Sequence, residues 1–456
     1  MRMGIGLGVG INRSNYAQGI FSAYQSRVIA DGGVTEAGAC VDAVSGLLQT
    51  ASLLLIPSGY KSGKAYAEIP TNGNGDLTWT RASTALRTNS SGLLESMGSG
   101  VPRLSYMYGS CPALLLEPQR TNLLQNQLSY NASTGVAYNT SVTDSPIIGI
   151  NSARITKNEA SGSVRYANQS CSNSALTGST TYTISAYFKY DGYDFQTSME
   201  YNNSTNFGGT SWTQPINIAS TGITLGTSSQ CTGNIQNVGN GWYRVSVTIT
   251  TGASPVGSTV TYLMRLPSTL STGQGFLQAV PQFEQGAYST TVIPTSGATA
   301  TRVADSFSRS NIYTNGLISA SGGTWFVELR NNVAVIADNA PSGFWLGTSS
   351  GTATSDGTIY FRQGGGTQRT NVWKYVSGTA TQLYQTTTDT TKIAIKWNGT
   401  TADIFENGTK VVSGTAFTAT NMEFLTTSGV GRPFFIQNMA LFNSALTDAQ
   451  CQTLTT

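Results

Sequence analysis

Carboxylates and tyrosines, the residue types from which a sugar site can be built, gather in one short stretch of the chain. The stretch holds three of each: Asp191, Asp194, Glu200, Tyr190, Tyr193 and Tyr201. A glycosidase needs two carboxyl groups about 5 to 10 Å apart. Tyrosine rings beside carboxylate acceptors could also bind a sugar without cleaving it. A solvated loop between two strands is the simpler interpretation, and it is the one we favour.

Tryptophan side chains are the other group that could bind a sugar ring, by stacking against it. Trp397 shares a strand face with Ile393 and Ile395, so it is expected in a core. Trp212 lies in a stretch rich in Gly, Thr and Ser and is the tryptophan least explained by packing. The candidate carbohydrate-binding residues are therefore Trp212, Tyr190, Tyr193, Asp191 and Asp194.

The residue types that are missing narrow the chemistry further. The chain has 456 residues and no histidine, which excludes Ser-His-Asp and Cys-His nucleophiles and histidine-ligated zinc or iron. The string Ser58-Gly-Tyr-Lys61 matches an S-x-x-K pattern, but its companion motifs are absent and chance explains it. No D-x-D-x-D-G calcium loop occurs. We expect no metal, no cofactor and no enzymatic activity.

Charge and hydropathy exclude two classes of partner. The net charge is +3, from 25 basic and 22 acidic residues, and no basic run stands out, so nucleic-acid binding is not expected. No run of 18 apolar residues occurs, so no membrane insertion is expected. Five widely spaced cysteines without a CxxC pair argue against a disulfide framework and are consistent with folding in a reducing compartment.

Alternating patterns after residue 122 predict the elements that would position these side chains. In Thr181–Tyr190 apolar and polar residues alternate with a period of two, which is typical of a half-buried strand. Trp242–Thr250 repeats the pattern directly after the turn residues 239–241. Further strands are expected at 259–266 and 276–283. Together they predict a first β-sandwich.

A second sandwich is predicted from the hairpin signals near the end of the chain. Two Asn-Gly pairs, Asn398-Gly399 and Asn407-Gly408, separate short strands. Such pairs favour type I′ turns, because both central residues need a positive φ. Thr447 followed by Gln450 predicts a capping box at the start of a C-terminal helix.

Residues 1–121 are the hardest region to interpret. A helical pattern spans residues 35–51, with Thr35 as the expected N-cap. Because the region offers little core of its own, we expect it to be ordered by a second copy of the chain or by a partner protein. A small irregular domain packed on the next sandwich is the alternative. The candidate anchoring and oligomerisation residues are Tyr16, Phe21, Tyr24, Val41, Val44, Leu47 and Leu48.

Three phrases of the sequence resemble one group of proteins. Cys111–Leu124, read as C-P-A-L-L-L-E-P-Q-R-T-N-L-L, resembles the junction that precedes β-sandwiches in bacteriophage virion proteins. Residues 283–295 resemble the exit of their carbohydrate-binding-like jelly roll. Residues 436–450 resemble the end of laminin-G or concanavalin-type lectin domains. The group comprises head-fibre, head-spike and tail-fibre proteins.

The resemblance implies an all-β fold with two tandem jelly-roll or lectin-like β-sandwiches after an N-terminal assembly segment that contains one short helix. The expected domains are a virion-attachment and oligomerisation region at 1–121, a carbohydrate-binding-module-like sandwich at 122–306 and a laminin-G or concanavalin-like sandwich at 307–456. Glu117 and Arg120 in the junction are expected to fix how the first sandwich sits on its base.

The resemblance also implies a function. It suggests a structural protein of the bacteriophage virion surface, made in the cytoplasm of a bacterial host, that decorates the capsid as a head fibre or spike and adheres to host or mucosal glycans. Its partners would be capsid, portal-collar or tail proteins, reached through residues 1–121, and further copies of itself in a homotrimer. The alternatives are a tail fibre or receptor-binding protein, a glycan depolymerase that uses paired carboxylates, and a decoration protein without a ligand.

Overall fold

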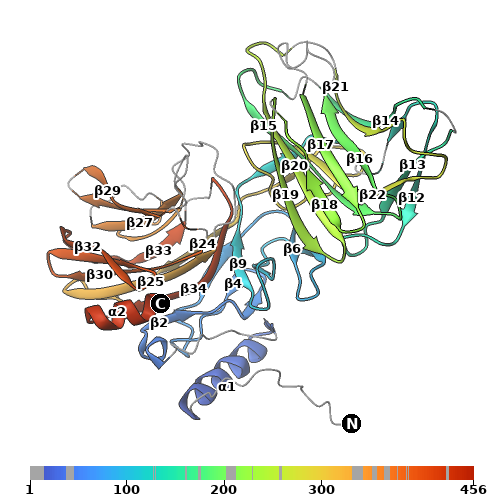
Figure 1. Cartoon of the computed structure of the whole chain (residues 1–456). Helices are drawn as coiled ribbons and strands as arrows, with labels where there is room; N and C mark the ends of the chain where they lie inside the picture. Colours follow the sequence, from blue (N-terminus) through green and yellow to red (C-terminus); the bar gives the residue numbers. More distant parts are fainter. Residues whose placement is uncertain are drawn as a thin grey trace, which may run out of the picture.

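The architecture comes from a computed structural model, drawn in Figure 1. It describes residues 15–36 and 46–456, apart from 127, 129, 160–161, 173–175, 202–211, 229, 256–258, 331–342, 352–356, 364–369, 377, 387, 389 and 428–430. Strands dominate the described residues, beside the helices α1 (Asn15–Ala30) and α2 (Asp448–Thr455). The predicted all-β fold class is confirmed. Figure 1 shows two bodies of strands with α1 lying below them.

The first body, here called the middle sandwich, consists of two six-stranded antiparallel sheets from residues 131–285. One sheet runs in the order β11 (Asn131–Ala132), β14 (Arg165–Ser172), β21 (Thr259–Leu266), β16 (Phe195–Tyr201), β17 (Trp212–Ala219) and β18 (Gly222–Leu225). The other runs in the order β12 (Val136–Val142), β13 (Ser152–Lys157), β22 (Gly275–Gln285), β15 (Thr181–Tyr190), β20 (Trp242–Thr250) and β19 (Thr232–Gly239).

Strand β15 shows that the middle sandwich packs against another part of the chain. It pairs with β20 on one side and β22 on the other, so it lies in the interior of its sheet. Ile184 and Phe188 point into the core of the middle sandwich, as the alternation predicted. Tyr187, on the opposite face, is also buried, because Leu86 and Leu94 cover it from a hairpin of β6 (Ala85–Thr88) and β7 (Leu94–Met97). The N-terminal region therefore packs against the middle sandwich.

The second body, here called the split sandwich, takes its strands from both ends of the chain. Its ten-stranded sheet runs β1 (Val34–Thr35), β3 (Gly59–Lys61), β4 (Lys64–Ala65), β5 (Leu77–Thr80), β24 (Ser306–Ser310), β33 (Phe424–Thr427), β26 (Gly343–Gly347), β27 (Thr358–Gln363), β28 (Thr370–Val376) and β29 (Thr379–Thr386). Its eight-stranded sheet runs β32 (Thr409–Ala416), β31 (Thr401–Glu406), β30 (Thr390–Asn398), β25 (Gly322–Arg330), β34 (Phe434–Phe442), β9 (Ala113–Leu116) and β8 (Arg103–Ser105), with β2 (Leu53–Leu55) also on β34.

Strands from residues 1–121 thus complete the C-terminal sheets within the same chain. β5 pairs with β24, and both β2 and β9 pair with β34, every residue of which is buried. A fully buried strand such as β34 needs partner strands on both sides to satisfy its backbone hydrogen bonds. The boundaries at 121/122 and 306/307 remain predictions. The sheets place the middle sandwich as an insertion between the two halves of the split sandwich.

The hairpin and cap predictions can be compared with the backbone directly. Asn407 and Gly408 both have positive φ, which confirms a type I′ turn between β31 and β32. At the other Asn-Gly pair, Asn398 pairs with Thr401, so the loop residues are Gly399 and Thr400. Gly399 has the positive φ there, as a type II′ turn requires. Thr447 and Gln450 form the predicted capping box of α2.

The N-terminal helix α1 lies before the stretch 35–51 in which the sequence predicted a helix. α1 covers Asn15–Ala30, whereas Thr35, the expected N-cap, is extended in β1 and pairs with Gly59. Leu48–Thr50 form a short 3-10 turn, η2. Residues 37–45, including Val41 and Val44, lie outside the described residues, as do the side chains of Tyr16 and Phe21.

The remaining candidate anchoring residues pack inside the chain. Tyr24 of α1 is fully buried against Val28 and Tyr66. Leu48 is 4% exposed in a cluster that also contains Leu454, and Leu47 packs on the same cluster. Tyr24 and Leu48 therefore fix α1 and η2 to the rest of the chain, so neither side chain is exposed for contact with another protein.

Two further expectations concern the chain as a whole. Cys111 is disulfide-bonded, which the wide spacing of the cysteines did not predict, whereas Cys171, Cys231 and Cys451 are free. Burial raises the pKa of the Cys171 and Cys451 thiols to about 12, which makes them poor nucleophiles. None of the described helices is long and apolar enough to cross a membrane.

Candidate functional site

The two connections between the sandwiches run side by side. The chain enters the middle sandwich through β10 (Arg120–Asn122) and leaves it through β23 (Ala300–Arg302), and these strands pair antiparallel. Asn122 is fully buried and contacts two segments of the chain. Its amide nitrogen donates to the Ile293 carbonyl at 3.0 Å, and its side-chain oxygen accepts from Phe283 N–H at 3.1 Å. This double connection is the base of the candidate site.

A buried network of charges lies directly beside this double connection. Arg103 donates to Glu117 Oε2 at 2.6 Å and also pairs with Asp305. Arg302 lies 3.0 Å from Glu117 Oε2, and Arg81 lies 2.9 Å from Asp305 Oδ1. All five side chains are at most 2% exposed. The network joins residues that precede the middle sandwich to residues that follow it.

Glu117 also holds the last segment of the middle sandwich. It accepts hydrogen bonds from Thr291 N–H at 2.7 Å and from Thr291 Oγ1 at 2.5 Å. Arg120 donates to Tyr288 OH at 2.8 Å, and Tyr288 in turn donates to the Gly431 carbonyl of the split sandwich. Glu117 and Arg120 thus both contact residues 284–291, although they do not pair with each other.

The electrostatics of the network keep Glu117 ionised. Burial by itself would raise its pKa, but the guanidiniums of Arg302 and Arg103 and the hydrogen bonds from Thr291 outweigh burial and lower the pKa from 4.5 to about 2. Burial lowers the pKa of Arg302 despite the attraction of Glu117. A guanidinium starts so high that it stays charged all the same. The network is therefore an ionic cluster at neutral pH.

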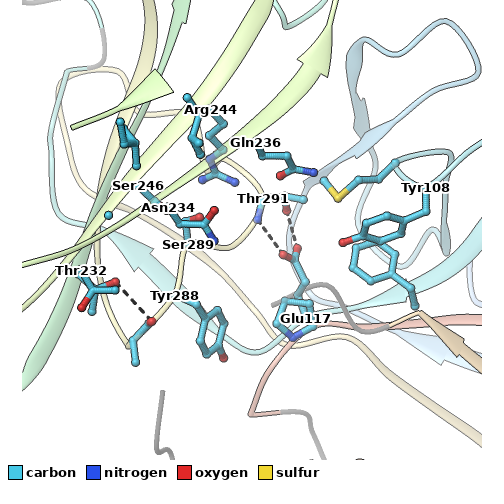
Figure 2. A pocket seen from close by; sticks show the side chains of 18 residues that line it. Tyr108, Glu117, Thr232, Asn234, Gln236, Arg244, Ser246, Tyr288, Ser289 and Thr291 are labelled. Atoms are coloured by element: carbon cyan, nitrogen blue, oxygen red, sulfur yellow. Dashed lines mark hydrogen bonds between the residues drawn. The ribbon is translucent and has the colours of Figure 1, made fainter. Parts of the chain in front are cut away.

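A pocket of about 480 Å³ opens above this cluster, between the two sandwiches. Figure 2 shows its polar wall on one side and aromatic rings with Glu117 on the other. The wall belongs to β19 and β20, while Tyr288, Ser289 and Thr291 follow β22. Met107, Tyr108, Pro433 and Phe435 come from the split sandwich.

The polar wall is a ladder of cross-strand pairs. Thr232 faces Thr248, Asn234 faces Ser246, and Gln236 faces Arg244. Because alternate residues of a strand point to the same face, these six side chains all project into the pocket. The described residues offer no hydrogen bond to the side-chain amides of Asn234 and Gln236, so these amides can bind a ligand or water.

The opposite wall supplies aromatic surface. Tyr108 and Phe435 pack edge to face, with ring centroids 4.7 Å apart. Tyr288 lies under the guanidinium of Arg120, 5.2 Å from the ring centroid. The pocket therefore combines rings on one side with amide and hydroxyl groups on the other.

The candidate residues chosen from the sequence lie elsewhere, around the turn between β15 and β16. Asp191 pairs with Arg154, and Asp194 accepts from Ser220 N–H at 2.9 Å. Tyr193 is 40% exposed, and Tyr190 packs partly on the core. These four residues do lie together near the surface. They do not line the pocket between the sandwiches.

Trp212 is not the exposed contact that the sequence suggested. It is 2% exposed and belongs to the core of the middle sandwich. The reason is the alternation of β17, in which Trp212, Gln214, Ile216 and Ile218 all point inward. Trp397, in contrast, lies in a core as predicted, with its Nε1–H donating to the Ser319 carbonyl at 2.9 Å.

Sequence reasoning missed the pocket because its wall looks ordinary in the sequence. The stretch Thr232-Gly-Asn-Ile-Gln236 alternates polar side chains, which is the pattern of any solvated strand face. That alternation was the available signal. Among the described residues, no group of three or more Cys, Asp and Glu side chains is placed to hold a metal ion.

Comparison with known proteins gives structural matches alone. No protein-family model matches the chain, and no curated protein matches it. It is similar to domain 4 of AbnA, an extracellular GH43 arabinanase from Geobacillus stearothermophilus solved with arabinotriose, at 18% identity and a TM-score of 0.26 over 37% of this chain and 81% of that chain.

Two further solved structures are similar to the chain. One is a carbohydrate esterase from the Shiga toxin-encoding bacteriophage phi24B, at 14% identity and a TM-score of 0.23 over 33% of this chain and 83% of that chain. The other is the CBM22 tandem domain of Xyn10C from Paenibacillus barcinonensis, at 10% identity and a TM-score of 0.22 over 71% of this chain and 96% of that chain. None of the three is a fibre or spike protein.

These matches overturn one expectation from the sequence. The chain was expected to have no enzymatic activity, whereas the solved structures that it resembles include one domain of an arabinanase and a carbohydrate esterase. The absence of histidine removes imidazole-based mechanisms but leaves carboxylate chemistry open. At these TM-scores the matches assign no activity to this chain.

Proposed function

We propose that the chain binds a saccharide in the pocket between the middle and the split sandwich. The observation that carries the proposal is the pairing of aromatic rings with the ladder of amide and hydroxyl groups on β19 and β20, around a space of about 480 Å³. Small-molecule sites typically enclose 300 to 1,000 Å³.

The chemistry of a sugar matches both walls. Its hydroxyl groups both donate and accept hydrogen bonds, as do amides and hydroxyls such as those of Asn234, Gln236 and Ser246. The less polar faces of a sugar ring can pack on Tyr108 or Tyr288. The binding geometry would be fixed in advance, because Glu117 of the charge network accepts hydrogen bonds from Thr291, which follows the last strand of the middle sandwich.

The place of the protein is a further part of the proposal. The likeness of residues 111–124, 283–295 and 436–450 to bacteriophage virion proteins supports a head fibre or spike at the virion surface, with a tail fibre as the alternative. Residues 1–121 would attach it to other virion proteins and to further copies, in a homotrimer. Several linked weak saccharide sites would then raise avidity without any new contact.

The turn between β15 and β16 is a second candidate contact surface. Tyr193 is exposed there, and the carboxylates of Asp191 and Asp194 lie beside it. We retain Tyr190, Asp191, Tyr193 and Asp194 as a proposed secondary contact. Asp191→Ala with Tyr193→Ala would leave binding unchanged if the pocket alone accounts for it.

Glycan cleavage is the competing activity. Glu117 is the one carboxylate among the described residues that line the pocket. Its low pKa prevents it from acting as a proton donor near neutral pH. A depolymerase would need a second carboxyl group from elsewhere. A reducing-sugar assay on host capsule tests this: steady turnover that is lost in Asp191→Asn or Asp194→Asn would replace pocket binding by catalysis as the main function.

A direct test compares two matched variants on a glycan array and by titration calorimetry. Gln236→Ala removes an amide from the pocket, and Gln196→Ala removes one from β16, where it contacts Asn217 outside the pocket. We expect Gln236→Ala to weaken binding about tenfold, as loss of one ligand hydrogen bond does, and Gln196→Ala to bind as wild type. Equal binding by both variants would contradict the proposal.

A further inference from the structure

Arg244 is the one strongly charged side chain in the polar wall of the pocket. It is 6% exposed, and Figure 2 shows its guanidinium beside Gln236 and Asn234 at the pocket. One nitrogen donates to Ser185 Oγ at 3.0 Å, and the guanidinium carbon lies 5.4 Å from the centre of the Tyr187 ring. Among the described residues no carboxylate lies within salt-bridge distance of it, and its Nε has no hydrogen-bond partner.

A buried guanidinium without an anion is costly. Removing a charge from water is unfavourable unless a counter-ion and hydrogen bonds replace the water. The Ser185 hydroxyl and the face of the Tyr187 ring replace only part of the lost hydration, because a guanidinium carries five N–H donors in a planar fork. A carboxylate is the group that this fork binds best, through two parallel hydrogen bonds. The side chain is thus set to bind an anion from the pocket.

The nearest acidic group does not serve this purpose. Glu117 also lines the pocket, but its two oxygens are bound by Arg103, Arg302 and Thr291. The local charge favours an anion as well. Around the pocket and the cluster below it, four guanidiniums face two carboxylates: Arg81, Arg103, Arg302 and Arg244 against Glu117 and Asp305. The neighbouring Arg120 and Glu284, 3.9 Å apart, balance each other.

The surroundings of Arg244 show how a sugar could present that anion. Gln236 lies directly across from it on β19, and Ser246 follows two residues later on the same strand face. Both can hydrogen-bond the hydroxyls of a ring whose carboxylate reaches Arg244. We propose that the pocket binds an acidic saccharide, with its carboxylate on Arg244. This inference rests on the proposed saccharide-binding function and names the class of ligand.

The experiment measures affinity of the full-length chain for matched acidic and neutral sugars by titration calorimetry. For hexuronic acids, the acidic probe is tetragalacturonate and the neutral probe is its carboxyl-reduced counterpart. For sialic acids, the acidic probe is 3′-sialyllactose and the neutral probe is lactose. We expect one acidic probe to bind at least about tenfold more tightly than its neutral partner. Which acidic probe binds tells the two sources apart.

Two substitutions test the role of Arg244. Arg244→Gln should lower the affinity for the acidic probe about tenfold to a hundredfold and lower the affinity for the neutral partner by much less. Arg244→Lys keeps the positive charge but not the planar fork of donors, so its loss of affinity for the acidic probe should be smaller. Arg165→Gln is the matched control, because Arg165 lies on β14, outside the pocket, and is paired with Glu159 at 2.7 Å. Unfolding midpoints show whether each variant is folded, and Arg244→Lys decides the question if Arg244→Gln does not fold.

The outcomes separate this inference from the function on which it rests. Equal affinity for acidic and neutral probes, both weakened by Gln236→Ala, would overturn the acidic class and keep the saccharide pocket. Tight acidic binding that is unchanged in Arg244→Gln and Arg244→Lys would overturn the role of Arg244. Acidic binding that depends on Arg244 but is unchanged in Gln236→Ala would contradict the hydrogen-bonding ladder. Binding of no probe would overturn the inference for both classes of acidic sugar.

Discussion

Glu117 at the junction and Glu68 beneath α1 are two buried carboxyl groups in opposite states. Glu117 is 1% exposed and Glu68 is 4% exposed. Burial raises the pKa of Glu68 from 4.5 to about 8, while the arginines around Glu117 lower its pKa to about 2. Both carboxyl groups are buried, so the difference between their pKa values comes from the groups that contact them. The same residue type is a fixed anion in one region and a neutral acid over most of the pH range in the other.

The partners of Glu68 are neutral. It accepts from Ile56 N–H at 2.7 Å, and Ser58 Oγ lies 2.6 Å from its other oxygen and 2.9 Å from Tyr24 OH. The nearby Arg27 is engaged by Asp76 at 2.7 Å. Hydrogen bonds from neutral groups do not offset the loss of hydration as a guanidinium does. The junction should therefore tolerate loss of its charge far less than the contact beneath α1.

The largest effect is expected from Glu117→Gln. It leaves Arg103 and Arg302 with one anion fewer in a buried cluster, which should destabilise the chain by about 3 to 5 kcal/mol. Urea unfolding followed by tryptophan fluorescence measures this. Glu159→Gln, at a partly exposed pair with Arg165, is the control and should unfold nearly as wild type. A loss for Glu117→Gln no larger than that of the control would remove the contrast between the two buried carboxyls.

The pH dependence of stability should carry the signature of Glu117 in acid. Its folded pKa lies below its unfolded value of 4.5, so it stabilises the fold above pH 4.5 and loses this contribution as the pH falls toward 2. The unfolding midpoint of the wild type should drop across this window. Glu117→Gln should show a smaller drop, and an equal drop in both proteins would mean that Glu117 is not held as an anion.

Glu68 should act in the opposite direction and at higher pH. Its folded pKa lies above 4.5, so folding favours its protonated form, and the stability of this region declines as the pH rises from 4.5 to about 8. Hydrogen exchange of α1 amides, corrected for intrinsic rates, should reveal more frequent opening at pH 8.5 than at pH 6. Glu68→Gln cannot ionise and should abolish the difference. A pH-independent opening in the wild type would contradict the raised pKa.

The smallest effect is expected at the surface. Asp191 pairs with Arg154, but side-chain exposures of 24% and 42% let water screen the pair. Asp191→Asn should change stability by about 0 to 1 kcal/mol, as exposed ion pairs do. The same urea series measures it. A loss as large as that of Glu117→Gln would show that burial is not what separates these sites.

Much of the local structure could be predicted from the sequence. The alternation of β15 and β20, the turn at Asn407-Gly408 and the capping box of α2 all depend on residues a few positions apart. Trp212 was misjudged because its loop-like surroundings hid the alternation of β17. The helix predicted at 35–51 failed at Thr35 because pairing with β3 overrode the local pattern.

The candidate site depended on long-range contacts instead. Arg103 and Asp305 lie 202 positions apart, and Arg81 and Asp305 lie 224 apart. Nothing in the local sequence around Arg81, Arg103 or Asp305 indicates these pairings. The pocket wall likewise becomes distinctive only because the split sandwich brings Tyr108 and Phe435 opposite β19.

The sequence by itself determined that this chain is built of strands, where several of them turn, and that imidazole chemistry is excluded, because strand periodicity, turn preference and composition are local properties. The tertiary structure decided which carboxylates stay charged, which arginine is left without an anion, and where a pocket opens. These depend on burial and on distances between remote residues, since the energy of a charge is set by what replaces its water.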